Sequence, residues 1–320
     1  MSSSIVLKPT QLVNARAEER NVREFQSYLR SKNLHTNFEL PRPIAILALN
    51  ETDENTASKR RDDDVVYAME RAIGDRLSEV IYNATRLGLA HEVERELGRA
   101  AEFLAAYHAW GETRRTAPRF QRTGSAEVER ILSQQGVPCN EIRVLAQAAE
   151  LCCQRPIRCT IKKDAHAENW IVLGRRLMML DLESTANVPV LFELAQLIED
   201  CGALPATIQG WHTRMKLADR YLSALAKLGC SVPISQEDVE LLYSLFWLLR
   251  CLFGFAYARR QSNATSSSSV IGRLAFRYSH WQQSAVYLAR SSAHSSIRDF
   301  AAKLSTFGER WRPGRFAKYG

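Results

Sequence analysis

The sequence predicts an α+β protein with a small strand-containing N-terminal part and a large, mainly helical C-terminal part. Apolar runs of strand length at 44–49 and 65–69 lie in the first part. After Gly74 the chain is rich in Ala, Leu, Glu and Arg, with apolar residues three and four positions apart, which is the helical spacing. One pair of strand-like runs around Gly174 interrupts the helices.

Length and charge set broad limits. The 320 residues, 46% of them hydrophobic, can bury one large domain or two lobes. A net charge of +8 attracts anions, which include nucleotides, phosphorylated substrates, nucleic acids and acidic membranes. The seven cysteines are odd in number and have no CxxC spacing, so we expect reduced thiols.

We expect a cytoplasmic protein without membrane contact. Residues 1–10 contain three serines and no long apolar run, so they do not resemble a secretory signal. The most apolar stretch, Leu241 to Tyr257, is interrupted by Arg250 and is shorter than the ~20 residues that span a bilayer. A buried core helix is the better interpretation of this stretch.

In the N-terminal part, Ser4 to Leu7 begins a short strand that ends in Lys8. Residues 15–30 read as a helix, because apolar residues fall on one face. The charged segment from Glu51 to Asp64 has no apolar pattern and reads as a solvated hairpin connection.

In the C-terminal part, the same spacing predicts helices and one hairpin. Ser235 and Asp238 resemble a helix N-cap pair. The helices are expected at 77–110, 128–135, 142–153, 190–201, 209–228, 236–259 and 279–290, and the hairpin strands at 170–173 and 177–180.

The segment with most chemical content is the loop before the hairpin, together with the residue that follows it. Asp164 and Asn169 lie in that loop, and Asp181 follows the second strand, so the hairpin should bring all three together. Phosphoryl transfer needs one carboxylate at the acceptor hydroxyl and oxygen ligands for magnesium. Carboxylate and amide oxygens suit Mg²⁺.

The pattern Asp-x-His-x-x-Asn, an apolar strand pair and then Asp-x-Glu resembles the aminoglycoside phosphotransferase and choline kinase group of the protein-kinase-like fold. The resemblance implies that Asp164 is the catalytic base or orients the hydroxyl, and that His166 braces the catalytic loop. It implies that Asn169 and Asp181 bind Mg²⁺. Glu183 matches an acidic residue often found after the metal-binding Asp.

The same resemblance assigns the nucleotide site. Lys8 would be the strand lysine that reaches the phosphates of ATP, and Glu24 is the first choice for its ion-pair partner, with Glu18 and Glu19 as alternatives. The run 65–70 resembles the strand and hinge that seat adenine. The expected hinge contacts are Met69, Glu70 and Ala72.

The resemblance implies a bilobal architecture that covers roughly Ile5 to Ala195, including a Leu-x-x-x-His pattern that ends at His108. Residues 1–75 would form a reduced nucleotide-binding N-lobe and hinge. Residues 76–320 would form a helical C-lobe with the catalytic loop at 160–185 and the helices of the substrate pocket.

Three features depart from the family. No glycine precedes Gly74, so we expect a short N-lobe without the family's glycine-rich hairpin, either because the chain is truncated or because this lobe lacks that lid. Lys162 and Lys163 replace the usual His-Gly before the catalytic Asp. Glu193 stands where the family often has Asp, which predicts an altered brace.

The leading hypothesis is an ATP- and magnesium-dependent phosphotransferase acting on a hydroxyl of a small aminoglycoside-, choline- or sugar-like acceptor. The first alternative is a catalytically inactive kinase-like binding or regulatory protein, and the missing glycine-rich hairpin favours it.

A third alternative is a basic nucleic-acid-binding helical protein, although nucleic acid is not the expected partner. The arginines at 114, 115, 119 and 122 are accompanied by only one aromatic residue, Phe120. Acidic residues of the helical tail could meet a cationic amine or simply be solvated; these are Glu199, Asp200, Glu237, Asp238 and Glu240.

Overall fold

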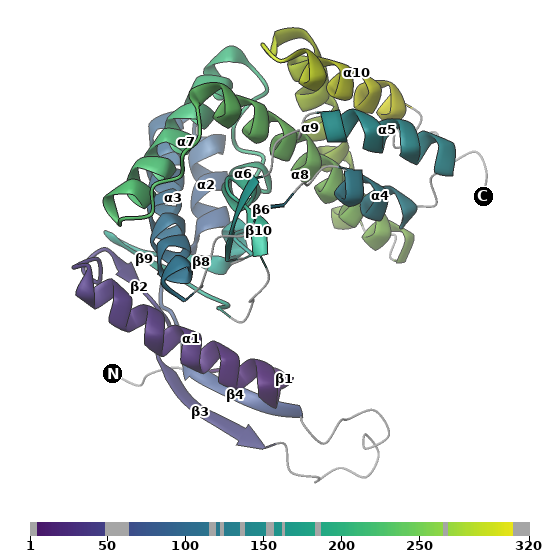
Figure 1. Ribbon diagram of the computed structural model, residues 1–320. Helices are drawn as coiled ribbons and strands as arrows, with labels where there is room; N and C mark the ends of the chain where they lie inside the picture. The colour runs from purple at the N-terminus through teal and green to yellow at the C-terminus, as the bar shows by residue number, and fades with distance from the viewer. Residues whose placement is uncertain are drawn as a thin grey trace.

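The computed structural model describes residues 5–48, 64–114, 120–121, 125–134, 138–151, 157–161, 164–182, 187–264 and 268–309. They form a small sheet-containing N-terminal part and a large helical part, as the sequence predicts (Figure 1). Most of the predicted connection at 51–64 lies outside the described residues, and so do Lys162, Lys163 and Glu183.

The N-terminal part is a three-stranded antiparallel sheet with one helix across it (Figure 1). The strand order is β1-β4-β3. The elements are β1 (Ile5–Gln11), α1 (Leu12–Ser31), β3 (Pro43–Ala48) and β4 (Asp64–Glu70). The first strand runs three residues beyond Lys8, which pairs with Tyr67 in the centre of the sheet.

Helix α1 connects this sheet to the helical part. Its residue Ala15 packs in a small cluster with Val65, Tyr67 and Met69. About three turns further on, the ring of Phe25 lies in the main core, and its centroid is 5.3 Å from that of Tyr107 in the helical part. A single amphipathic helix therefore packs against both parts.

Two further sheets belong to the helical part. The four-stranded sheet has the order β2-β9-β8-β5 and contains β2 (Phe38–Glu39), β5 (Asp75–Arg76), β8 (Trp170–Leu173) and β9 (Arg176–Met179). The other sheet, β10-β7-β6, contains β6 (Phe120–Gln121), β7 (Ile157–Ile161) and β10 (Asn187–Pro189). The β8–β9 hairpin confirms the prediction, and Gly174 adopts φ +59° at its turn.

The helices largely follow the predicted pattern. They are α2 (Leu77–Arg86), α3 (Ala90–Thr113), α4 (Ser125–Ser133), α5 (Cys139–Leu151), η2 (Ala167–Asn169), α6 (Phe192–Glu199), α7 (Ile208–Lys227), α8 (Gln236–Ala264), α9 (Ser268–Ser291) and α10 (Ser295–Glu309). The helix predicted at 77–110 is two helices, because Gly88 (φ +70°) breaks it. The last helix, α10, was not predicted.

Helix α8 lies at the centre of the helical part, packed against α6 and α9. Within the described residues, its segment Gln236–Ser262 is the one helix long and apolar enough to cross a membrane, and 83% of its most apolar window is buried. Trp247 in its middle is fully buried. Its start confirms the predicted cap, because the Asp238 backbone NH donates to Ser235 Oγ at 3.1 Å.

Candidate active site

Asp164 lies between β7 and η2, with its backbone in the left-handed region at φ +67°. Residues other than glycine seldom adopt this conformation, and it concentrates at functional sites. Two side chains of α6 hold Asp164: its backbone NH donates to Glu193 Oε1, and Gln196 Nε2 donates to Asp164 Oδ1 at 2.6 Å. One carboxylate oxygen is thus fixed, while the side chain stays 38% exposed.

Glu193 is fully buried and links the Asp164 loop to the helical core. Its Oε2 lies 3.0 Å from Nε2 of His108, and His108 Nδ1 lies 2.6 Å from the hydroxyl of Tyr221. Three helices, α3, α6 and α7, therefore fix the backbone at Asp164. The sequence predicts that Glu193, in the place of the family's Asp, alters this brace. A carboxylate still supports the loop, because the Glu193 side chain accepts a hydrogen bond from the Asp164 backbone NH.

Asn169 and Asp181 are brought together by the β8–β9 hairpin, as expected. Trp170 pairs with Met179, and the next backbone NH, that of Leu180, donates to the Asn169 carbonyl at 2.9 Å. The Asn169 side chain donates through Nδ2 to the Asp164 carbonyl at 3.0 Å, so its Oδ1 is the amide atom that can serve as a ligand. Asp181 also has a positive φ, +61°.

Lys8 connects the N-terminal sheet to this cluster. Its Nζ lies 2.6 Å from Asp181 Oδ1 and 3.0 Å from Glu18 Oε2. Burial lowers the pKa of Lys8, but the carboxylates of Glu18 and Asp181 outweigh this effect, so the pKa is raised and the ammonium stays charged.

The first choice for the Lys8 partner was wrong, and the alternative Glu18 is correct. Glu18 is 1% exposed, whereas Glu24 is 43% exposed and lies 3.2 Å from Arg114 Nη2. Six residues along an α-helix rotate the side chain by about 240°, so Glu24 projects from a different face of α1 than Glu18.

His166 stays close to the carboxylate that it was expected to brace. Its Nε2 lies 3.8 Å from Asp164 Oδ2, and its backbone carbonyl accepts from the Asn169 NH at 3.0 Å. Its side chain is 33% exposed, so the firm support of the loop comes from Glu193 and Gln196 instead.

The expected hinge residues lie at and just beyond the end of β4. Met69 is buried, and the Glu70 backbone NH donates to the Arg42 carbonyl at 2.9 Å. Ala72 follows in the irregular connection to Gly74. A nucleotide contact by Met69, Glu70 or Ala72 stays a prediction.

A cavity of about 1110 Å³ opens beside Asp164 and His166. Helix α2 and the η2 turn form one wall, which includes Glu79 and Glu168. Helices α8 and α9 form another wall, which includes Arg250. An acceptor in this cavity would lie within reach of the Asp164 carboxylate.

The acidic residues of the helical tail do not present free carboxylates to this cavity. Glu199 is buried, and its two oxygens accept from Arg214 at 2.8 Å each. Asp200 lines the cavity, but its Oδ2 accepts from Arg250 Nη2 at 2.7 Å. Glu237 and Asp238 lie in the first turn of α8 and Glu240 follows in the next, and none of the three is part of the cavity lining.

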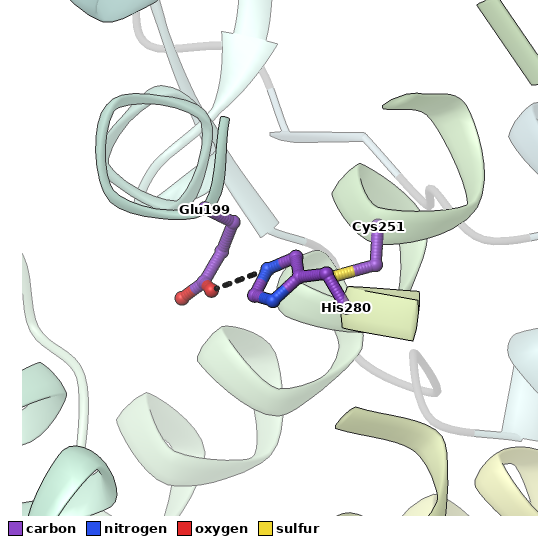
Figure 2. A group of neighbouring side chains, drawn as sticks. All are labelled: Glu199, Cys251 and His280. Atoms are coloured by element: carbon purple, nitrogen blue, oxygen red, sulfur yellow. Dashed lines mark ion pairs between the residues drawn. The ribbon is translucent and has the colours of Figure 1, made fainter. Parts of the chain in front are cut away.

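A buried polar network lies behind the α8–α9 wall. Figure 2 shows Glu199, Cys251 and His280 pointing toward one another. One carboxylate oxygen, the sulfur and one ring nitrogen of these residues all lie within 4.8 Å of one another. His280 Nε2 is 3.5 Å from Glu199 Oε2. Burial raises the pKa of Glu199, but Arg214 outweighs this effect and lowers it to about 2.

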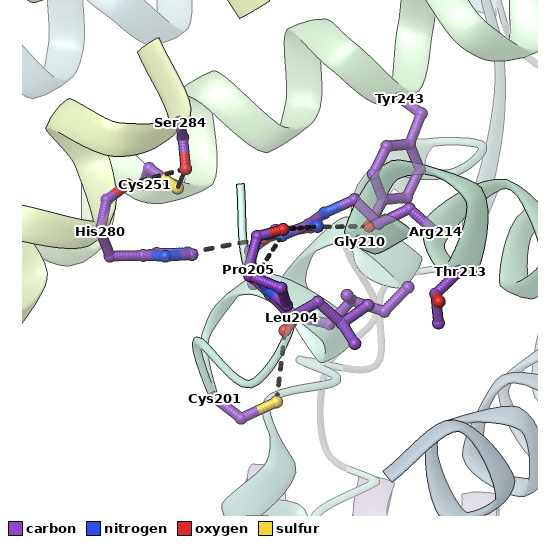
Figure 3. A network of polar contacts seen from close by, with 12 residues as sticks. Cys201, Leu204, Pro205, Gly210, Thr213, Arg214, Tyr243, Cys251, His280 and Ser284 are labelled. Atoms are coloured by element: carbon purple, nitrogen blue, oxygen red, sulfur yellow. Dashed lines mark hydrogen bonds and ion pairs between the residues drawn. The ribbon is translucent and has the colours of Figure 1, made fainter. Parts of the chain in front are cut away.

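We interpret this cluster as an ion-pair network and not as a metal site. Arg214 occupies both oxygens of Glu199, and it also donates to the carbonyls of Leu204 and Pro205 at 2.9 Å each (Figure 3). Tyr243 adds a hydrogen bond of 2.8 Å to Glu199. A fully satisfied buried carboxylate is a poor metal ligand, and the network instead fixes α6 against α7, α8 and α9.

Sequence reasoning missed Gln196. It lies three residues after Glu193 on α6, and both side chains reach Asp164. The i, i+3 spacing of Gln196 from Glu193, which places both on one face of a mostly apolar helix, was the available signal.

The sequence matches no protein-family model and none of the curated proteins. Among solved structures, it is similar to a glucosamine kinase, with a TM-score of 0.51 and 13% identity over 97% of this chain and 72% of that chain. Glucosamine kinase in complex with glucosamine, ADP and inorganic phosphate gives a TM-score of 0.50, with 14% identity over 81% of this chain and 69% of that chain. A choline kinase from Cryptosporidium parvum Iowa II gives 0.47, with 12% identity over 89% and 81%. The chain therefore has the protein-kinase-like fold found in small-molecule kinases.

Proposed function

We propose that this chain transfers the γ-phosphoryl group of ATP to a hydroxyl of a small molecule. The observation that supports this most strongly is the placement of Asp164. Its carboxylate lies at the edge of the cavity, in a strained backbone held by Glu193 and Gln196, and it is joined through Asn169 to the hairpin that carries Asp181. The small-molecule kinases among the structural neighbours support the same reaction class.

In this proposal, Asp164 orients the acceptor hydroxyl and receives its proton. The hydroxyl oxygen attacks the γ-phosphorus, the bond to the bridging oxygen of ADP breaks, and the proton moves to the Asp164 carboxylate. The hydrogen bond from Gln196 to Oδ1 orients the carboxylate, and in this proposal Oδ2 receives the proton of the hydroxyl. Positioning and electrostatics supply most of the rate enhancement in such reactions.

The residues fit a magnesium ion. Asn169 Oδ1 and the Asp181 carboxylate are hard oxygen donors, and Asn169 Nδ2 is already engaged by the Asp164 carbonyl. The Asp181 carboxylate already binds one cation, because its Oδ1 lies 2.6 Å from the Lys8 ammonium nitrogen. A bound Mg²⁺ would neutralise charge on the phosphates.

Nucleotide binding would use Lys8 together with the hinge at the end of β4. Glu18 holds the Lys8 ammonium on the side that faces Asp181, where the phosphates would lie next to the metal ligands. Met69, Glu70 and Ala72 would then contact the adenine ring. Among the structural neighbours, one is described with ADP and another with AMP-PNP and Ca²⁺.

The first test is thermal unfolding with ATP, with and without Mg²⁺, because a ligand that prefers the folded state raises its stability. We expect a magnesium-dependent rise in Tm that Asp181→Asn abolishes and Asp164→Asn retains. Asp219→Asn, an exposed aspartate on α7, is the matched control and should behave as wild type.

ATP turnover distinguishes the proposed phosphotransferase from an inactive kinase-like binding or regulatory protein. Wild type should consume ATP in the presence of a hydroxyl acceptor, and Asp164→Asn should lose this activity while still binding ATP. Binding of ATP without turnover on any acceptor would favour the inactive binding or regulatory protein. No effect of ATP at millimolar concentration would contradict the proposed nucleotide site.

A further inference from the structure

The cavity wall built from α8 and α9 is basic. Arg250 projects from α8, and Arg273 and Arg277 project from α9, where they lie one helical turn apart. The two helices pack along each other, which brings all three guanidinium groups to the cavity that contains Asp164.

Gly254 allows Arg277 to lie close to the backbone of α8. A Cβ atom at Gly254 would be 3.1 Å from Nη1 and 3.3 Å from Cδ of Arg277, so the arginine side chain packs over this glycine. Gly254 itself lines the cavity and lies one turn after Arg250. The position of Arg277 is therefore set by helix packing, unlike that of a lysine or arginine on an open surface.

The charges of these three arginines are not equally compensated. Arg250 donates to Asp200 at 2.7 Å. Within the described ranges, no carboxylate lies within ion-pair distance of Arg273 or Arg277, and Arg273 donates only to the neutral Gln261 Oε1, at 3.2 Å. Two like charges one helical turn apart destabilise the helix, and an anion between them would remove that repulsion.

The acidic residues of the cavity lie on other elements. Glu79 belongs to α2, and Glu168 of the η2 turn pairs with Arg76 at 2.7 Å. The cavity is therefore polarised: Glu79, Asp164 and Glu168 come from α2 and the loop around η2, Asp200 is paired with Arg250, and Arg273 and Arg277 of α9 have no paired carboxylate among the described residues. A phosphate or carboxylate matches the forked geometry of guanidinium groups.

We propose that the acceptor carries an anionic group, a carboxylate or a phosphate ester, which Arg273 and Arg277 bind while its hydroxyl faces Asp164. The proposal rests on the proposed phosphotransferase function, whose acceptor class it specifies. A cationic amine, which the sequence left open as one kind of acceptor, is not favoured, because Glu199 and Asp200 are engaged by Arg214 and Arg250.

The test is calorimetric binding without nucleotide, using sugar probes matched in size. Gluconate is compared with sorbitol, glucose 1-phosphate with glucose, and glucosamine serves as the cationic probe. We expect at least one anionic probe to bind about tenfold more tightly than its neutral match. The double variant Arg273→Gln/Arg277→Gln should reduce this preference to within about threefold, whereas Arg290→Gln, an exposed arginine further along α9, should retain it.

Equal binding of charged and neutral probes, tighter binding of glucosamine, or no binding of any probe at ~10 mM would overturn the proposal. An undiminished preference for anionic probes in the double variant would also overturn the proposal. The two anionic probes distinguish a carboxylate from a phosphate ester. Because no nucleotide is present, this result is independent of the ATP and Mg²⁺ measurement that tests the proposed function.

Discussion

The backbone NH of Asp164 donates to the carboxylate of Glu193, which makes a buried glutamate the support of the candidate catalytic loop. The second oxygen of Glu193 contacts His108 at 3.0 Å. One side chain thus holds a strained backbone on one side and the core of α3 on the other.

Replacing Glu193 should therefore affect both stability and activity. Glu193→Ala leaves a buried imidazole and a backbone NH without their partner, and we expect the free energy of unfolding to fall by about 3–5 kcal/mol. Glu193→Asp is one methylene shorter and should lose one of its two contacts, with a smaller loss of about 1–2 kcal/mol. Urea denaturation measures both. Equal stability of wild type and Glu193→Ala would contradict this role.

Gln196 should act on the reaction and not on the fold. Its amide donates to Asp164 Oδ1 at 2.6 Å, so Gln196→Ala frees the carboxylate to rotate away from the acceptor. We expect kcat of phosphotransfer to fall by roughly 10- to 100-fold, with KM for ATP unchanged. Gln209→Ala, an exposed glutamine on α7, is the control. A change in KM for ATP alone would contradict this role.

The loop and hairpin of the candidate site could be predicted from the sequence because their information is local. Asp164 and Asn169 are five residues apart, and the short β8–β9 hairpin fixes where Asp181 returns. The family resemblance points to Glu193 as a brace, but the contact of Gln196 could not be predicted, since it meets Asp164 across 32 residues through the packing of α6.

The ion-pair partner of Lys8 could not be predicted from the sequence for the same reason. A choice among Glu18, Glu19 and Glu24 depends on which face of α1 meets the strand, and that follows from long-range packing of Phe25 on Tyr107. The charge distribution of the cavity beside Asp164 could not be predicted either, because the contact between Gly254 of α8 and Arg277 of α9 depends on how the two helices pack.

Glu18 and Glu24 give a matched test of the corrected ion pair. Glu18→Gln removes a buried carboxylate from Lys8 and should lower the free energy of unfolding by about 2–4 kcal/mol. Glu24→Gln affects a half-exposed pair with Arg114 and should change it by less than about 1 kcal/mol. Thermal or urea denaturation compares the two variants directly. A larger loss of stability in Glu24→Gln than in Glu18→Gln would contradict the assignment of Glu18 as the partner of Lys8.

The buried His280 predicts a pH dependence of stability. Burial lowers the pKa of His280, but the neighbouring Cys251 and Glu199 more than offset this effect, so the pKa is raised from 6.5 to about 10. A raised pKa in the folded state means that the stabilisation is complete below pH 6.5 and is lost as the pH rises through about 10.

We therefore expect the free energy of unfolding of wild type to fall, relative to His280→Gln, by about 2–4 kcal/mol between pH 6.5 and 10. Urea denaturation at pH 6, 8 and 10 measures this difference. His212→Gln, an exposed histidine on α7, should follow the wild-type curve. Parallel curves for wild type and His280→Gln would contradict a raised pKa of His280 in the folded state.

Gly74 fixes the junction between the N-terminal sheet and the helical part. A Cβ atom there would lie 2.3 Å from the Val172 carbonyl oxygen, which belongs to strand β8 and cannot move without disturbing the β5–β8 pairing. We expect Gly74→Ala to lower the free energy of unfolding by about 2–3 kcal/mol. Gly272→Ala is the control, because that helical glycine has open space around it and alanine should stabilise α9 by up to about 1 kcal/mol. If Gly74→Ala is as stable as wild type in urea denaturation, the close contact between Gly74 and strand β8 does not contribute to stability.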